Sequence, residues 1–131
     1  MKYIDTELLD ETSKRAKKSE RLRMNYNFHE NLDAPAQRLL NALEPGTILP
    51  IHRHQHTAET YVLLRGKIKV LFYNDKKEII EERVLNPLEG VYGVNIPKNT
   101  WHTLEVLEKE SVLFEVKDGP YTPLQETDTL S

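Results

Sequence analysis

The chain has 131 residues, a formal net charge of −3 and no cysteine. This length is enough for one domain with a hydrophobic core. The weak negative charge gives no electrostatic reason to expect nucleic-acid binding, and the lack of cysteine excludes disulfides, cysteine-ligated zinc and thiol nucleophiles. No apolar run approaches the roughly 20 residues that span a bilayer, and the first residues lack the apolar segment of a signal peptide. We therefore expect a cytoplasmic protein without a membrane partner.

The first predicted element is a short amphipathic helix over residues 5–18. Asp5 or Thr6 can cap its N-terminus, and residues such as Leu8 and Ala16 recur on one face. The basic run at its end suits the negative pole of the helix dipole, so a solvated helix end explains this run better than a binding patch does. We assign residues 1–20 to an N-terminal helical segment.

The second predicted element, residues 22–28, has a period of two and therefore indicates a strand. One face is apolar, and the polar side carries Arg23, Asn25, Asn27 and His29. Two interpretations remain open: an ordinary solvent-exposed face, or the wall of a ligand pocket. In the second case unpartnered polar groups would be costly to bury, so these side chains would need a ligand, ordered water or one another.

The remainder of the chain up to residue 117 consists of short apolar runs separated by turn-forming residues. We predict strands at 36–44, 47–54, 60–64, 67–73, 78–85, 91–96, 101–107 and 111–117. Many short strands with frequent turns indicate a sandwich or a barrel. We therefore assign residues 21–117 to a β-barrel. Residues 118–131 contain prolines and no periodicity, and we expect an irregular or disordered C-terminal arm there.

Metal-binding residue types are concentrated in two of these segments. His52 and His54 are separated by one residue, so on a regular strand their imidazoles point to the same side. Glu59 opens the next strand and can add an oxygen ligand, and His102 offers a third imidazole. Three imidazoles and one carboxylate suit a divalent transition metal. We predict that these four residues hold one divalent ion per chain, with zinc, iron and nickel all suitable.

The spacing of these residues resembles the two signature motifs of the cupin superfamily. The first motif is Gly, five residues, His-x-His, three or four residues, Glu, six residues, Gly, and it is met in full from Gly46 to Gly66. The second motif is met in part: Pro97 and His102 fit, and Asn99 replaces a glycine, which is mild because asparagine tolerates the left-handed conformation. The first glycine and the last asparagine of that motif are missing from their expected positions. The resemblance implies an all-β cupin jelly roll, the double-stranded β-helix.

Longer literal strings resemble the WbuC family of small cupin-fold metalloproteins. They are Arg-Leu-Arg-Met-Asn-Tyr-Asn-Phe-His at residues 21–29 and Gln-Arg-Leu-Leu-Asn-Ala-Leu-Glu-Pro-Gly-Thr at residues 37–47. This resemblance covers most of residues 1–117 and implies an association with gene clusters for surface polysaccharides such as O-antigen, but no reaction. One departure is His56, which stands near an expected proline. It is either a solvent-exposed loop residue or an additional group of the site.

Three functions are compatible with these features. The first is a metal-dependent isomerase, epimerase or lyase acting on a sugar or nucleotide sugar, the second a non-catalytic module that binds a sugar or metabolite, and the third a mononuclear iron dioxygenase. Arg23 or Arg38 can pair with the phosphate or carboxylate of an anionic sugar derivative. Tyr61 and Trp101 can stack on a sugar ring, although wall packing explains Trp101 more simply. Because sheet edges need cover, we also expect a twofold-symmetric homodimer.

Overall fold

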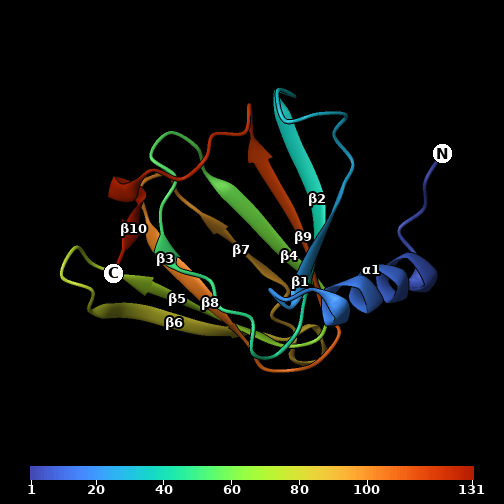
Figure 1. Ribbon diagram of the computed structural model, residues 1–131. Helices are drawn as coiled ribbons and strands as arrows, with labels where there is room; N and C mark the ends of the chain where they lie inside the picture. The colour runs from blue at the N-terminus through green and yellow to red at the C-terminus, as the bar shows by residue number, and fades with distance from the viewer.

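Two five-stranded antiparallel sheets form most of the computed structural model, which describes all residues 1–131 (Figure 1). Sheet A has the strand order β1-β2-β9-β4-β7. Its strands are β1 (Arg23–Asn27), β2 (Ala36–Leu43), β9 (Ser111–Asp118), β4 (Glu59–Arg65) and β7 (Gly93–Ile96). Apart from β1 and β2, neighbouring strands in this sheet come from distant parts of the chain, as the jelly-roll interpretation requires.

Sheet B has the strand order β10-β3-β8-β5-β6 and faces sheet A. Its strands are β10 (Thr129–Leu130), β3 (Ile51–His52), β8 (Trp101–Val106), β5 (Ile68–Tyr73) and β6 (Ile79–Leu85). Two short 3₁₀ helices, η1 (Pro87–Glu89) and η2 (Glu126–Asp128), lie in the connections. This arrangement confirms the predicted all-β fold with one short N-terminal helix.

The main hydrophobic core lies between the two sheets. Because side chains alternate along a strand, Leu63 of β4 and Leu113 of β9 point inward from sheet A and cluster with Val70 of β5 and Leu104 of β8 from sheet B. Full burial of such a side chain stabilises the fold by about 1.5–3 kcal/mol. This apolar core fixes the sheets against each other and so provides a rigid frame for the polar groups between them.

The N-terminal helix α1 (Thr6–Lys18) packs against the outer face of sheet A (Figure 1). The side chain of Asp5 caps it by accepting a hydrogen bond from the Leu8 N–H at 3.0 Å. Leu8 and Ala16 are buried against Leu40 of β2 and Val112 of β9. The structure therefore confirms the predicted helix, its cap and its apolar face.

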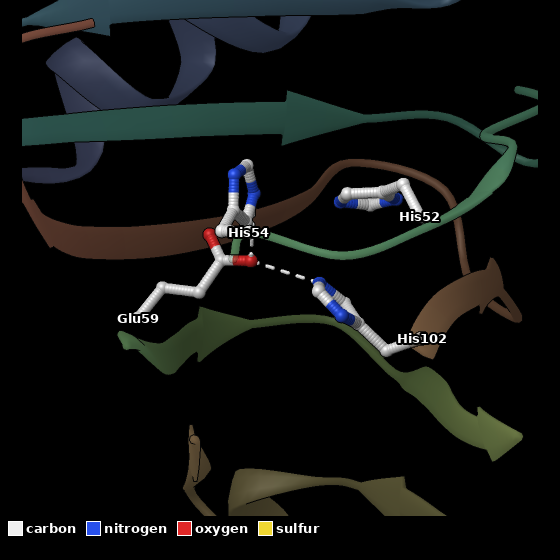
Figure 2. A group of neighbouring side chains, drawn as sticks. All are labelled: His52, His54, Glu59 and His102. Atoms are coloured by element: carbon white, nitrogen blue, oxygen red, sulfur yellow. Dashed lines mark hydrogen bonds and ion pairs between the residues drawn. The ribbon is translucent and has the colours of Figure 1, made fainter. Parts of the chain in front are cut away.

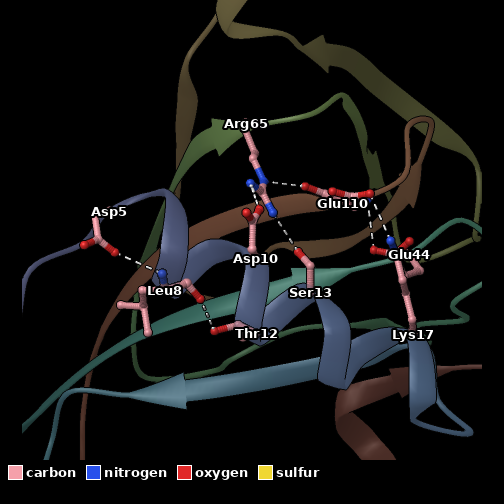
Figure 3. A network of polar contacts seen from close by, with 9 residues as sticks. All are labelled: Asp5, Leu8, Asp10, Thr12, Ser13, Lys17, Glu44, Arg65 and Glu110. Atoms are coloured by element: carbon pink, nitrogen blue, oxygen red, sulfur yellow. Dashed lines mark hydrogen bonds and ion pairs between the residues drawn. The ribbon is translucent and has the colours of Figure 1, made fainter.

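A polar network fixes the orientation of α1 on the sheet. Figure 3 shows Arg65, at the end of β4, donating hydrogen bonds to Asp10 Oδ1 at 2.7 Å, Ser13 Oγ at 3.1 Å and the Glu110 carbonyl at 2.9 Å. Lys17 forms an ion pair with Glu110 at 2.9 Å. Each charged group in this network thus has a complementary partner, so the network joins the helix to the sheet.

Two parts of the chain differ from what the sequence pattern predicts. The strand predicted at 47–54 is reduced to Ile51–His52. The C-terminal arm has no helix or strand from 119 to 125, but it ends in η2 and in β10, which pairs with β3. A two-residue strand is too short to show a period, so the sequence pattern gives no sign of this ordered end. No helix of the structure is both long enough and apolar enough to cross a membrane.

Candidate metal centre

Three side chains from the two sheets and one from a loop converge at one site (Figure 2). One ligand atom from each of His52, His54, Glu59 and His102 lies within 4.8 Å of the others. Glu59 belongs to β4 of sheet A, whereas His52 and His102 are directly opposite each other on β3 and β8 of sheet B. The folding of the two sheets against each other thus brings the four predicted ligands together.

His54 reaches this cluster from a loop and not from a strand. β3 ends at His52, and the next backbone N–H, that of Arg53, donates to the carbonyl of Asp128 at 3.0 Å. The expectation that His52 and His54 share the face of one regular strand is therefore wrong in detail. The two rings nonetheless lie 5.3 Å apart between centroids, because the loop turns His54 toward Glu59.

A tight turn before β8 supports both halves of the cluster. Asn99 adopts the left-handed conformation with a φ of 61°, as its replacement of a motif glycine predicts. Its backbone N–H donates to the His54 carbonyl at 2.7 Å. The turn therefore connects the His54 loop directly to the start of the strand that carries His102.

Backbone carbonyls fix the orientation of two of the imidazoles. His52 Nδ1 lies 2.9 Å from the Pro50 carbonyl, and His102 Nδ1 lies 2.8 Å from the Thr100 carbonyl. A carbonyl only accepts, so Nδ1 carries a proton in each ring and Nε2 is the nitrogen left to bind a metal. The Nε2 of His102 lies within hydrogen-bond distance of the Glu59 carboxylate, so a bound ion would take the place of the proton between them. Carbonyl partners of this kind are typical of histidines that bind a metal through the other nitrogen.

Glu59 is buried and lies between two of the imidazoles. Its Oε1 is 2.8 Å from His102 Nε2 and 3.2 Å from His54 Nε2, and it accepts a hydrogen bond from the Tyr61 hydroxyl at 3.2 Å. Burial opposes ionisation of this carboxyl, but the hydrogen bonds with His102 and His54 outweigh it and hold the pKa of Glu59 below its usual range. Glu59 is therefore a carboxylate at neutral pH and an anionic oxygen ligand.

His52 is held in its neutral form. Burial, followed by the positive charge of a protonated His102, lowers the pKa of His52 to about 4. A neutral imidazole is the form that binds metal ions, because protonation removes the lone pair. No proton has to leave His52 at neutral pH before it can act as a ligand.

The donor set fits a divalent transition metal. Three imidazole nitrogens and one carboxylate oxygen are typical ligands of zinc, iron and nickel. Ligand atoms about 2.1 Å from an ion lie at most about 4.2 Å apart, so the observed spread of up to 4.8 Å needs only a small inward movement of the side chains. His56 is exposed and lies outside the four-residue group.

The polar residues of β1 do not contact these ligands. Arg23 donates to the Ile48 carbonyl at 2.9 Å and so holds the loop that leads to β3. Asn25 and Asn27 are exposed. β1 forms one edge of sheet A, with β2 as its only partner strand. The period of two is correct, but the edge position leaves most of the polar face to solvent, as the simpler of the two interpretations predicts.

The other predicted pocket residues have separate partners. His29 Nδ1 lies 3.1 Å from the backbone nitrogen of Arg38, whose own side chain is exposed. Trp101 is buried, donates to Asp75 at 2.8 Å and has the Arg53 guanidinium 4.3 Å above its ring. These contacts stabilise turns and the barrel wall. Tyr61 is thus the one predicted pocket residue that contacts the cluster, through its hydroxyl.

Sequence reasoning missed two polar residues on the inner face of β9. Glu115 lies opposite Tyr61, and Lys117 lies opposite Glu59. Burial and then the negative charge of Glu59 raise the pKa of Glu115 to about 7, and Asn41 donates to its Oε1 at 2.9 Å. The signal was present in the sequence, because charged residues at inward positions of an otherwise apolar strand are uncommon.

The end of the C-terminal arm lies beside the histidines. β10 pairs with β3 so that Thr129 is opposite His52. Arg53 donates to the Thr127 carbonyl at 3.1 Å, and Gln55 donates to the Asp128 carboxylate. The arm and the histidine loop together line a cavity of about 190 Å³, which also includes His54 and Lys117. One ligand of the cluster is therefore accessible from a defined pocket.

Solved structures with the cupin fold are similar to this chain. KdgF from Halomonas sp. is 17% identical over 76% of this chain and 82% of its own, with a TM-score of 0.60. The capsular polysaccharide assembling protein CapF from Staphylococcus aureus is 21% identical over 80% of this chain and 28% of its own, with a TM-score of 0.64. The Schizosaccharomyces pombe Cnp3 cupin domain is 12% identical over 76% and 66%, with a TM-score of 0.59.

At these low identities the structural similarity shows the cupin fold alone. This chain spans less than a third of the length of CapF. Comparison with curated protein sequences gives no match. A family model described as a domain of unknown function, DUF6016, matches residues 4–85, which is more than half of the chain. The chain therefore belongs to the DUF6016 family.

Proposed function

We propose that this protein is a metal-binding cupin in which His52, His54, Glu59 and His102 hold one divalent ion. The convergence of these four ligand atoms within 4.8 Å is the observation that carries the proposal. The carbonyl partners of His52 and His102 support it, because they occupy Nδ1 and leave Nε2 of both rings as the nitrogen that can bind the ion. When bound, such an ion supplies a Lewis acid that polarises a carbonyl or activates water.

We further propose that the ligand is a small sugar or anionic sugar derivative used in surface-polysaccharide assembly. Two similarities support this role: the WbuC-like strings of the sequence and the fold shared with CapF, a capsular polysaccharide assembling protein. The chemistry that we favour is isomerisation, epimerisation or elimination on a sugar or nucleotide sugar. We also propose that the protein is cytoplasmic and forms a homodimer. Light scattering at micromolar concentration tests the dimer directly, because a monomer mass would contradict it.

Elemental analysis and substrate screening test the two levels of this proposal. Protein purified without nickel resin should contain one equivalent of a single divalent metal, and an absence of bound metal would contradict the metal site. Incubation of this protein with a panel of nucleotide sugars, followed by product analysis, tests the enzyme. Binding without turnover would instead support the non-catalytic module, and oxygen consumption by iron-loaded protein would support the dioxygenase.

A further inference from the structure

The inner face of β9 carries two charged side chains beside the candidate metal centre. Lys117 lies directly across the sheet from Glu59, and Glu115 lies across from Tyr61. Their side chains therefore point into the space between the sheets. The next inward residue of the same strand, Leu113, belongs to the hydrophobic core. Apolar side chains can therefore pack this face of β9, and the packing of the barrel does not account for the two charged ones.

Lys117 makes no direct contact with an acidic group, although its charge acts at longer range on Glu115. Lys17 and Arg65 form ion pairs with Glu110 and Asp10, whereas Lys117 forms no ion pair and no side-chain hydrogen bond. It is partly buried and lines the cavity of about 190 Å³ together with His54. An unpaired ammonium group in a cavity beside a metal ligand is suited to bind the anionic group of a ligand.

Glu115 has only part of its hydrogen-bonding capacity filled. Asn41 Nδ2 donates to Oε1 at 2.9 Å and so fixes the orientation of the carboxyl group. Oε2 makes no hydrogen bond with another side chain. Glu115 is the next inward residue after Lys117 on β9, and two residues along a strand span about 7 Å. A ligand whose anionic group binds Lys117 can therefore present a hydroxyl group to Glu115.

We propose that Lys117 and Glu115 form a subsite for a small hydroxylated anion, with Asn41 as the residue that positions Glu115. This inference rests on the proposed metal-binding function and deepens it by naming the class of ligand. The cavity that Lys117 lines has a volume that corresponds to about six water molecules, which suits a three- or four-carbon hydroxy acid or its phosphorylated counterpart. Glu115 does not line this cavity but lies at the next inward position of β9.

Titration of the zinc-loaded protein with three probes tests the subsite. Glycerate supplies a carboxylate, glycerol 3-phosphate supplies a phosphate, and glycerol supplies the same hydroxyl groups without charge. We expect at least one anion to bind at least tenfold tighter than glycerol in calorimetry. Lys117→Met should reduce this preference at least tenfold with unchanged zinc content. Lys69→Met is the matched control, because Lys69 is also partly buried but lies on the outer side of β5, and it should bind as the wild type does.

A second comparison tests Glu115. Lactate lacks the terminal hydroxyl group of glycerate, so the wild type should bind glycerate at least threefold tighter than lactate, and Glu115→Leu should bind the two alike. Equal binding of the anions and glycerol, no binding of either anion, or wild-type binding by Lys117→Met would overturn the subsite. Two measurements keep this result separate from the metal site. Zinc analysis decides the metal proposal, which fails if no zinc binds. Titration of the chelated protein with the anions, and the loss of their preference in Lys117→Met, then still decides the subsite.

Discussion

The two polar networks on either side of sheet A differ in how completely their charges are paired. On the outer face, Arg65 has three acceptors, and Glu44 accepts from the Glu110 backbone N–H at 2.9 Å (Figure 3). On the inner side, one carboxylate lies between two imidazoles (Figure 2). Lys117 makes no ion pair or side-chain hydrogen bond there. The first network is complete without a ligand, whereas the second has donors and acceptors left over. The outer network is thus suited to stabilise the fold, whereas the unpaired groups of the inner network are those that the proposed metal and ligand would use.

This comparison has a consequence for mutations. Changes around α1 should lower the free energy of unfolding and leave metal retention intact, because no ligand lies there. Changes around Glu59 should alter metal or ligand binding and leave the fold intact. The following predictions test that separation, from the largest expected effect to the smallest.

Gly66→Ala should destabilise the protein most. Gly66 has a φ of 98°, and a Cβ atom there would lie 2.6 Å from the backbone Cα of Ser111. Left-handed strain and overpacking together cost about 4 kcal/mol. Urea denaturation measures this change. Gly90→Ala is the control, because its φ is 80° but nothing lies within 4 Å, so it should cost about 1 kcal/mol. Similar losses in both variants would contradict the steric explanation.

Glu115→Gln should change the pH dependence of stability in the metal-free protein. The folded-state pKa of Glu115 is raised from 4.5 to about 7 by burial and by the charge of Glu59. Its contribution to stability is therefore fully present below pH 4.5 and is lost as the pH rises through about 7. We expect the variant to gain up to about 3 kcal/mol relative to the wild type across this window. Denaturation from pH 4 to 8 tests this, and parallel stability curves would refute it.

Arg65→Met should lower the free energy of unfolding by about 2 kcal/mol, since it leaves the buried hydroxyl of Ser13 and the Glu110 carbonyl without their donor. Metal content should not change. Arg15→Met is the matched control, because the ion pair of Arg15 with Glu11 is exposed and contributes about 0.5 kcal/mol or less. A loss of metal in Arg65→Met would break the proposed separation between the two networks.

Tyr61→Phe should weaken metal binding about tenfold, which is the usual effect of removing a group that orients a ligand. The hydroxyl of Tyr61 donates to Glu59 Oε1 at 3.2 Å, and phenylalanine keeps the buried ring. Competition with a chelator measures the affinity. Tyr92→Phe, at an exposed position, is the control. Wild-type affinity in Tyr61→Phe would show that this hydroxyl does not orient Glu59 for the metal.

The fold and the cluster of four candidate metal ligands could be predicted because their signals are local or carried by spacing. The helix has a cap at Asp5 and a periodic apolar face, and the strands alternate. The ligand set follows from a motif, and Asn99 shows the expected left-handed conformation. The polar face of β1 was harder to interpret, because a period of two does not reveal whether a strand lies at an edge.

Other features depend on contacts that no sequence pattern records. His54 lies beyond the end of β3, and the Arg53 N–H before it donates to the Asp128 carbonyl, a pairing between residues distant in sequence. β10 and the position of the arm beside the histidines could not be predicted for the same reason, because β10 pairs with a strand that is distant in the sequence. Lys117 and Glu115 could have been noticed as charged residues at inward positions of β9, but only the pairing of β9 with β4 places them beside Glu59.

The metal content of protein purified without nickel resin tests the central claim most directly. Elemental analysis of the wild type should give one equivalent of a divalent metal per chain, and His52→Ala with His54→Ala should give almost none, because two of the four ligands are removed. The double variant should unfold with the same free energy as the chelated wild type. Full metal occupancy in this double variant, or a wild type that holds no metal after zinc, iron or nickel is supplied, would contradict the account.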